Sequence, residues 1–339
     1  MDPSQKESLE ARAVEFREKF AAIRDQIGKM IVGQRRVIDD VLIALFSGGH
    51  CLLEGVPGLG KTLLVRTLSD ALDLEFRRIQ FTPDLMPADI IGTNMVMEDE
   101  QGQRKFVFQK GPVFGQIILA DEINRATPKT QSALLEAMQE RSVTVGGVMY
   151  KLAPPFCVLG TQNPLEMDGT YPLPEAQLDR FFFKILVGYP SREDLSTVLD
   201  RTVTAFVYEK RILMNGREIE DWKKLVLQVV VAPHVQDYAV RLALATHPHG
   251  TFAVPSTNRF VRYGSSPRGV QALVLAAKIQ ALLDGRYNVS FEDLRASAYP
   301  ALRHRILLNF EAEAEGITPD SIIKEVLEKT PETEAQVAA

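Results

Sequence analysis

The sequence has few cysteines and no long apolar run, the features that stabilise small secreted proteins and anchor proteins in membranes. It contains two cysteines, Cys51 and Cys157, both inside short apolar segments, which is too few thiols for a disulfide or zinc framework. No uninterrupted apolar run approaches the roughly 18 residues of a membrane span. The N-terminus, MDPSQKE, is charged and has no signal-peptide core. We therefore expect a cytoplasmic protein without direct membrane insertion.

Concentrated positive charge is also lacking. The chain has 39 Lys and Arg against 44 Asp and Glu, a formal net charge of −5, and its cations form no dense cluster. Because nucleic-acid-binding domains ordinarily carry a basic face, no nucleic-acid partner is expected. There is no internal repeat and no guanine-specific NKxD signature. The 339 residues, 45% of them hydrophobic, are sufficient for two domains with real cores.

The most informative segment present is GVPGLGKT, residues 55–62, between the apolar residues 51–53 and a helix-like run. A glycine-rich turn at a helix N-terminus lets backbone N–H groups converge on phosphate oxygens. Lys61 is expected to reach the β- and γ-phosphates of a nucleotide, and the Thr62 hydroxyl to bind Mg²⁺. The predicted nucleotide-binding residues of this loop are Gly55, Pro57, Gly58, Leu59, Gly60, Lys61, Thr62 and Leu63.

A second apolar run, residues 117–120, ends in Asp121 and Glu122. Such a run indicates a strand covered on both faces, and ligands bind beyond the carboxyl ends of parallel strands. Asp121 is suited to hold Mg²⁺ beside Thr62, and Glu122 to polarise an attacking water. Alone, the pair would be a solvated acidic turn, but beside a phosphate loop it predicts hydrolysis.

Two further polar residues stand at the ends of predicted strands. Asn163 follows the apolar residues 156–160 and is placed to orient the water or contact the γ-phosphate. A turn asparagine before proline explains it equally well in isolation. Arg180 immediately precedes the apolar run 181–187, at the strand end opposite to the one at which the chain's own nucleotide would bind. It is therefore suited to serve a neighbouring subunit.

A third candidate lies far downstream, in Ser266-Pro267-Arg268. Ser266 is a typical N-cap and Pro267 a typical first helical residue. Arg268 then stands in the first helical turn, where the macrodipole disfavours a cation. A bound polyphosphate would remove that conflict, and a solvated surface arginine is the alternative.

The ordered segments GVPGLGKT, IILADEIN, GTQNP, LDRF and GSSPRG resemble those of AAA+ ATPases, and they are most similar to the MoxR family. The resemblance covers about residues 20–325. The resemblance implies that Val32, Gly33 and Gln34 lie against the adenine, that Asn163 is the sensor-1 residue, that Arg180 is an arginine finger acting in trans, and that Arg268 is the sensor-2 arginine. Arg125 and Arg141, which flank one predicted helix, stay open as alternatives to Arg180 for the trans-acting residue.

Apolar spacing predicts the domain organisation. Residues 1–30 read as an amphipathic helix packed on the core. Alternating strands and helices indicate an α/β fold with a parallel five-stranded sheet, followed by a C-terminal all-helical lid. The resemblance implies that the α/β part is a P-loop AAA+ core. Strands are expected at 50–54, 75–80, 117–121, 156–161 and 181–187. The core spans 31–190 with hairpin insertions near 94–109 and 143–152, followed by a linker at 191–232, the lid at 233–327 and a disordered tail at 328–339.

The resemblance also implies a function: Mg²⁺-dependent ATP hydrolysis by a hexameric ring that acts as a chaperone-like motor, with the nucleotide between core and lid. The protein client expected is one with a von Willebrand A domain. The hairpin at 94–109 is expected to offer it one apolar face, formed by Met95, Met97, Phe106 and Phe108. Two alternatives remain, a DNA-engaged motor of MCM-like type and a nucleotide-gated scaffold with little hydrolysis. The acidic hairpin turn argues against the first, and Glu122, Asn163 and Arg180 against the second.

Overall fold

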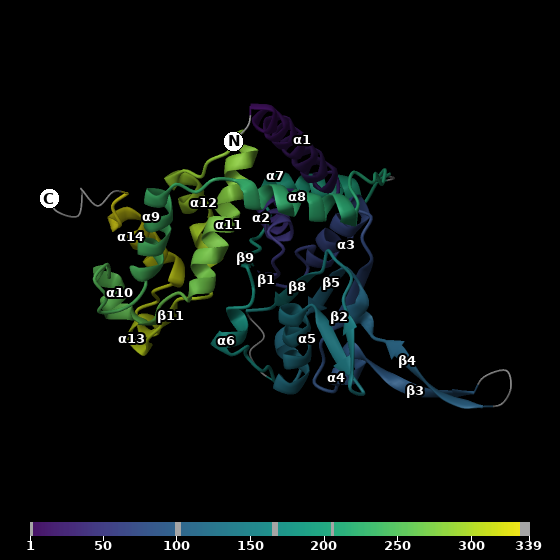
Figure 1. Cartoon of the computed structure of the whole chain (residues 1–339). Coiled ribbons are helices and arrows are strands. Elements are labelled where there is room, and N and C mark those ends of the chain that lie inside the picture. Colours follow the sequence, from purple (N-terminus) through teal and green to yellow (C-terminus); the bar gives the residue numbers. More distant parts are fainter. Residues whose placement is uncertain (1–2, 99–102, 165–168, 205–206, 333–339) are drawn as a thin grey trace.

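The computed structural model describes residues 3–98, 103–164, 169–204 and 207–332. An α/β core occupies one side of the molecule and a helical region the other, with the long helix α1 (Pro3–Gly28) lying along their upper side (Figure 1). The repeating apolar residues Phe16, Phe20, Ile23 and Ile27 of α1 are buried. The Ala13 N–H also donates to the hydroxyl of Tyr287 in the helical region, at 3.3 Å. The first helix therefore packs on both parts of the molecule.

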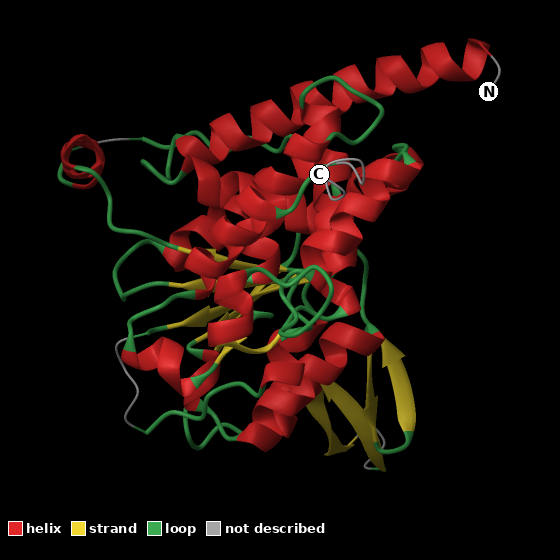
Figure 2. Ribbon diagram, turned by 90° about the vertical axis from the view of Figure 1, so that its left-hand side faces the viewer, coloured by secondary structure: helices red, strands yellow, loops and turns green. Residues whose placement is uncertain are grey.

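One parallel sheet of five strands organises the core, in the order β2-β5-β8-β1-β9. The predicted α/β sheet is confirmed, and the predicted strand ends differ from the observed ones by at most two residues. Helices cover both faces (Figure 2), so alternate residues such as Leu52 and Leu53 enter two different apolar clusters. The strands are β1 (Cys51–Glu54), β2 (Phe76–Gln80), β5 (Ile117–Asp121), β8 (Cys157–Gln162) and β9 (Phe183–Leu186).

The connections between these strands carry the helices and both predicted hairpins. The core helices are α2 (Arg35–Phe46), α3 (Lys61–Ala71), α4 (Pro87–Ile91), α5 (Pro128–Glu140) and α6 (Glu175–Leu178), with short 3₁₀ turns at Pro112–Phe114 and Ile123–Arg125. The hairpins are β3 (Gly92–Glu98) with β4 (Arg104–Lys110), and β6 (Ser142–Val145) with β7 (Val148–Lys151). The β3–β4 hairpin extends well away from the core (Figure 1).

The prediction of one apolar face on the first hairpin is wrong. The register places Val96 opposite Phe106 and Met95 opposite Val107. Because paired residues share a face of an antiparallel ribbon, Met95 and Met97 lie on the side opposite to Phe106 and Phe108. Both faces therefore carry exposed apolar side chains, and residues 99–102 at the tip lie outside the described residues. Phe108 stacks on Tyr150 of the second hairpin, with ring centroids 4.2 Å apart.

The segment 191–232, expected as a linker, holds two helices, α7 (Arg192–Thr202) and α8 (Gly216–Gln228). Asn215 caps α8 by accepting from two backbone N–H groups, and the Glu218 carboxylate in turn accepts from the Asn215 N–H. The apolar side of α8 buries Trp222 and Leu225 in the main core. Helix α8 is therefore part of the core, and its capping box was the sequence signal for it, whereas α7 buries no residue.

The C-terminal region is helical, as predicted, apart from one short antiparallel pair, β10 (Val261–Tyr263) with β11 (Leu307–Leu308). Its helices are α9 (Pro233–Leu244), α10 (Pro255–Phe260), α11 (Pro267–Leu283), α12 (Phe291–Leu302), α13 (Phe310–Ala314) and α14 (Pro319–Lys329).

The prediction of a disordered tail at 328–339 is wrong for its first residues, 328–332. Helix α14 continues to Lys329, Thr330 is buried, and Arg241 donates to the carbonyls of Pro331 and Glu332. Residues 333–339 lie outside the described residues. No helix within the described ranges combines the length and apolarity needed to cross a bilayer.

Candidate nucleotide site

The phosphate loop, the acid pair and Asn163 meet at the carboxyl edge of the sheet. The loop joins β1 to α3, Asp121 ends β5, and Asn163 follows β8. Since β1, β8 and β5 are adjacent and parallel, their carboxyl ends open into one cleft of about 390 Å³. The residues that line the cleft are Pro57, Gly58, Leu59, Gly60, Lys61, Thr62, Leu63, Asp121, Glu122, Thr161, Gln162 and Asn163.

The loop leaves room for a polyphosphate. Gly58 and Gly60 adopt φ angles of 83° and 77°, in the left-handed region that glycine enters without strain. A Cβ atom built on either glycine would meet no heavy atom within 4 Å. Backbone conformation, and not crowding, therefore requires glycine here, and the open space is what a phosphate group would occupy. Helix α3 begins at Lys61, so its N-terminus faces the same space.

Lys61 is held at the loop by its own chain. The ammonium group donates to the carbonyl oxygens of Gly55 and Val56, the latter at 3.4 Å. Partial burial lowers the pKa of Lys61, while the nearby charges of Asp121 and Glu122 oppose that shift. The balance keeps a cation directed at a cleft whose other ionisable groups are acids.

Thr161 organises both acids. Its hydroxyl donates to Asp121 Oδ1 at 2.7 Å and accepts from the Glu122 backbone N–H at 2.8 Å. The other carboxylate oxygen of Asp121, Oδ2, accepts from Arg78 on β2 at 2.7 Å. Thr161 is 1% exposed, so the two hydrogen bonds of its hydroxyl are largely shielded from water. The sequence did not single out Thr161, although it lies on β8 only two residues before Asn163.

Glu122 has an unusual backbone and two side-chain partners. Its φ and ψ are 55° and 50°, the left-handed region that non-glycine residues seldom adopt. Its Oε2 accepts from Gln80 Nε2 and from Arg125 Nη1, each at 2.9 Å. The left-handed turn points the carboxylate out of the strand direction. Arg125, one candidate for the trans-acting arginine, thus lies on the phosphate-loop side of its own subunit.

The segment Val32-Gly33-Gln34 reaches the same loop from α2. The Gln34 side chain is buried, and its Nε2 donates to the Leu59 carbonyl at 3.0 Å. Its Oε1 is buried without a hydrogen-bond partner in the described part of the chain. Val32 is half-buried and Gly33 exposed. The predicted adenine segment is therefore connected to the phosphate loop through one side-chain amide.

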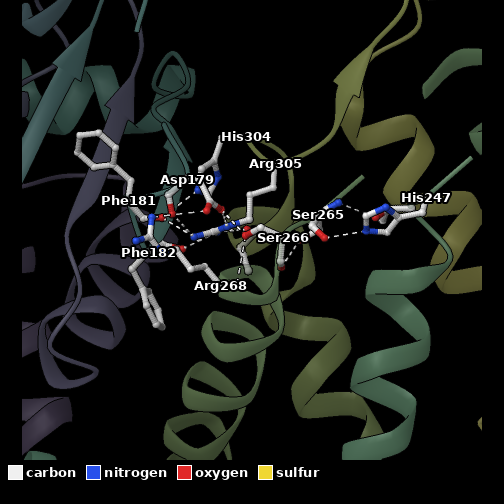
Figure 3. Close-up of polar contacts among 11 residues, drawn as sticks. Asp179, Phe181, Phe182, His247, Ser265, Ser266, Arg268, His304 and Arg305 are labelled. Atoms are coloured by element: carbon white, nitrogen blue, oxygen red, sulfur yellow. Dashed lines mark hydrogen bonds and ion pairs between the residues drawn. The ribbon is translucent and has the colours of Figure 1, made fainter. Parts of the chain in front are cut away.

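Arg180 and Arg268 lie elsewhere. Both line a second cleft, of about 290 Å³, at the opposite edge of the sheet, where residues 47–50 lead into β1. Arg268 was expected to link a nucleotide to the helical domain, and the structure places it beside Arg180, outside the phosphate-loop cleft of its own chain. A tertiary contact holds it there: Ser266, the N-cap of α11, donates its hydroxyl to Asp179 at 2.7 Å and ties the helix N-terminus to the loop before β9 (Figure 3).

This second cleft is strongly cationic. Arg141, Arg180, Arg268 and Arg305 line it, with Asp179 as its one lining carboxylate. Burial lowers the pKa of the adjoining His50 to about 3, so its imidazole adds no charge. We call this cleft, defined by Arg180, Arg268 and Asp179, the arginine cleft.

The arginines of the arginine cleft differ in how they are held. Arg141 donates to the carbonyls of Gly48 and Phe156, which occupies it structurally. Arg180 is half-buried and donates through Nη1 to the Leu135 carbonyl at 2.8 Å. The Arg268 side chain is 46% exposed and approaches Asp179 no closer than 3.7 Å. Arg180 and Arg268 are therefore the cations that an outside anion can reach.

Comparison with known proteins agrees with this architecture. The sequence model of the ATPase family associated with various cellular activities (AAA) matches residues 50–183, and that of the AAA lid domain matches residues 256–326. The chain is 42% identical to a crystallised protein from Cytophaga hutchinsonii that is provisionally described as an ATPase. The TM-score is 0.89, and the match covers 96% of this chain and 98% of that one.

Curated relatives give the family. Chaperone MoxR1 of Mycobacterium tuberculosis is 43% identical over 303 residues, 89% of this chain and 79% of that protein. Protein MoxR of Methylorubrum extorquens is 32% identical over 351 residues, 95% of this chain and 97% of that protein. These identities over most of the chain show that it belongs to the MoxR family of chaperone-like AAA+ ATPases.

Proposed function

We propose that the chain hydrolyses ATP with Mg²⁺ as a ring in which Arg180 and Arg268 of one subunit complete the phosphate-loop cleft of the next. The observation that supports this most is the separation of the two clefts, which share no lining residue and open at opposite edges of one sheet. No side chain of the arginine cleft reaches the phosphate loop of its own chain. Two copies placed edge to edge would bring the halves together, and a heterologous contact of this kind closes into a ring.

Within one subunit, the phosphate-loop cleft supplies binding and water activation. Lys61 and the N-terminus of α3 would hold the β- and γ-phosphates, and Thr62 with Asp121 would hold Mg²⁺. The metal, when bound, would neutralise charge on the phosphate oxygens. Glu122 would orient and deprotonate the water, with Asn163 beside it.

The neighbour would supply charge stabilisation. As phosphoryl transfer proceeds, negative charge spreads over the leaving and transferred oxygens, and a guanidinium at that point is worth roughly 10³–10⁵ in rate. Arg180 is presented by a loop that a strand holds in place, and Arg268 by the first turn of a long helix. Their shared cleft carries excess positive charge, which suits it to a polyphosphate and not to a neutral surface.

Subunit mixing tests this arrangement directly. Glu122→Gln chains cannot activate water but still offer Arg180, whereas Arg180→Ala chains keep their own acids but offer no arginine. Each variant alone should be nearly inactive. Mixed equally, they should recover roughly a quarter of the wild-type rate, because about one in four random heterologous contacts pairs a competent donor with a competent acceptor. No recovery in assembled mixed rings would contradict catalysis across the subunit interface.

We also infer a protein client, and the family resemblance favours one with a von Willebrand A domain. The β3–β4 hairpin supports a client contact because Phe106 is 80% exposed and Val96, Met95 and Met97 are each about half exposed. An extended ribbon with apolar side chains on both faces is more than the protection of sheet edges requires.

The two faces of the hairpin allow a matched experiment. A Glu122→Gln ring loaded with ATP should capture a purified von Willebrand A protein encoded by a neighbouring gene. Val96→Ser with Phe106→Ser changes one face, and Met95→Ser with Met97→Ser changes the other. One pair should weaken capture at least tenfold more than the other while basal hydrolysis is unchanged. Capture by both variants at the level of the Glu122→Gln ring with an unchanged hairpin would assign the hairpin a structural role.

A further inference from the structure

Asp179 is the point at which the lid meets the loop that carries Arg180. Its Oδ1 accepts from the Ser266 hydroxyl at 2.7 Å and from Arg305 Nε at 2.9 Å. Its Oδ2 lies 3.7 Å from Arg268 Nη1. Figure 3 shows the carboxylate surrounded by these three residues of the lid. One acidic group of the core therefore touches both the helix that carries Arg268 and a second lid arginine.

Arg305 holds the backbone on both sides of Arg180. Its guanidinium donates to the carbonyl oxygens of Asp179 at 3.1 Å, Phe181 at 2.7 Å and Phe182 at 3.2 Å. The neighbouring His304 Nε2 bonds the Phe181 carbonyl as well, at 3.0 Å. The Arg305 side chain is 2% exposed, so these bonds form where water does not compete.

This arrangement is more than is needed to attach a lid. Burial lowers the pKa of Arg305 to about 10, and Asp179 opposes that shift, so the group stays charged at neutral pH. A buried, charged, planar donor that binds three carbonyls within the four residues 179–182 leaves the loop little freedom. Arg180 itself takes no part in these bonds and contacts the Leu135 carbonyl. Its position is set by the residues on either side of it.

We propose that Asp179, Arg305 and Ser266 are positioning residues that couple the seating of the lid in one subunit to catalysis in its neighbour. They fix Arg180 of the core and Arg268 of the lid as one dicationic unit in the arginine cleft. When the lid shifts on its core, the unit is lost, and the neighbour's nucleotide loses its charge stabilisation. This inference rests on the proposed function, since it assumes that the arginine cleft serves the adjacent subunit.

The experiment extends the mixing assay and separates the donor role from the acceptor role. Asp179→Asn with Glu122→Gln is the test donor for Arg180→Ala acceptors, and it should restore at least tenfold less activity than Glu122→Gln alone. Asp179→Asn as acceptor, mixed with Glu122→Gln donors, should recover at least as much activity as Arg180→Ala acceptors do, with an unchanged KM for ATP. A merely structural role would damage donor and acceptor activity alike.

Asp320 provides a matched control. It accepts from Arg303 at 2.9 and 2.8 Å, and Arg303 donates to the core carbonyl of Lys184 at 3.3 Å. This contact also joins lid to core through an arginine, but away from Arg180. Asp320→Asn with Glu122→Gln should therefore be a full donor. Ser266→Ala should weaken the donor activity of the subunit in the mixing assay, and Ser266→Thr should restore that activity. This pair keeps the test available if Asp179→Asn folds poorly.

Each outcome decides the proposal. A donor defect confined to Asp179 and Ser266 variants supports it. Full donation by Asp179→Asn chains, or equal defects in donation and acceptance, would overturn it. If Glu122→Gln and Arg180→Ala themselves fail to complement in assembled rings, the proposed function fails first, and that result is distinguishable from failure of the positioning residues alone.

Discussion

The phosphate-loop cleft and the arginine cleft are built in opposite ways. The first is assembled from strand ends of one sheet, and its partners come from neighbouring strands, as when Thr161 of β8 bonds Asp121 of β5. The second is assembled from two domains, with Asp179 of the core bonded to Ser266 and Arg305 of the lid. Rigid elements therefore hold the groups to which we assign nucleotide binding and water activation, whereas the arginines to which we assign charge stabilisation lie where the lid meets the core.

This difference suggests why a motor would divide its site. A cleft made within one sheet keeps its geometry when domains move, because strand register resists sliding. A cleft made between domains changes whenever the domain contact changes. If the proposed function holds, placing the arginines in the second kind of cleft makes hydrolysis in one subunit sensitive to the conformation of the next.

The largest effect that would test the comparison is expected from Arg180→Ala. Turnover should fall roughly 10³–10⁵-fold, because the transition state loses a guanidinium while the ground-state contacts remain. ATP affinity measured by calorimetry should stay nearly unchanged. Lys61→Ala is the matched opposite, since it should abolish both binding and turnover. Weakened ATP binding by Arg180→Ala in dilute, monomeric protein would show that the two clefts are not separate.

Arg268→Ala should have a smaller effect, roughly 10- to 100-fold on turnover, the 1.5–3 kcal/mol of one charged hydrogen bond. Asp179 already offsets part of its charge at 3.7 Å. Hydrogen exchange should show ATP-induced protection of residues 266–283 only in assembled rings, and the variant should lose that protection. Protection in monomers would place Arg268 against its own nucleotide instead.

The smallest effect is expected at the boundary between core and lid, away from both clefts. Burial raises the pKa of Asp40 in the folded chain to about 6 from an ordinary 3.8, even though Arg36 and Arg303 lie nearby. The folded state thus binds the proton more tightly than the unfolded state, so the buried charge destabilises the fold increasingly as pH rises from about 4 through 6.

Asp40→Asn removes that charge. It should raise the free energy of unfolding at pH 8 by roughly 1–3 kcal/mol, with the gain disappearing below about pH 4, and leave turnover unchanged. Urea denaturation at pH 8, 6 and 4 is the measurement. A loss of stability at pH 8 would mean that attraction to the charges of Arg36 and Arg303 outweighs the desolvation of the carboxylate.

Much of the core was predictable because its signals are local. The loop 55–62 combines glycines, a lysine and a threonine at offsets that few other structures use. The apolar runs at 117–120 and 156–160 indicate strands buried on both faces. Because parallel strand ends share an edge, Asp121 and Asn163 could be placed near the loop without knowing any side-chain contact.

Other features were not predictable because they depend on contacts between distant segments. Gln80 and Arg78 face the acid pair only because β2 is the neighbour of β5. The faces of the first hairpin depend on its register, and shifting a strand by one residue exchanges its two faces. The packing of α8 was missed because a mixed segment hid a short, well-capped helix.

The sequence by itself determined the family, the phosphate loop, the acid pair and the five strands, since each depends on residues close together in the chain. Only the tertiary structure decided that Arg268 lies beside Arg180 and away from the phosphate loop. Residue 268 is far from residue 180 in the chain, and no local periodicity records how a lid docks on a core. The decisive contact is the hydrogen bond of Ser266 with Asp179, which forms only after both domains have folded.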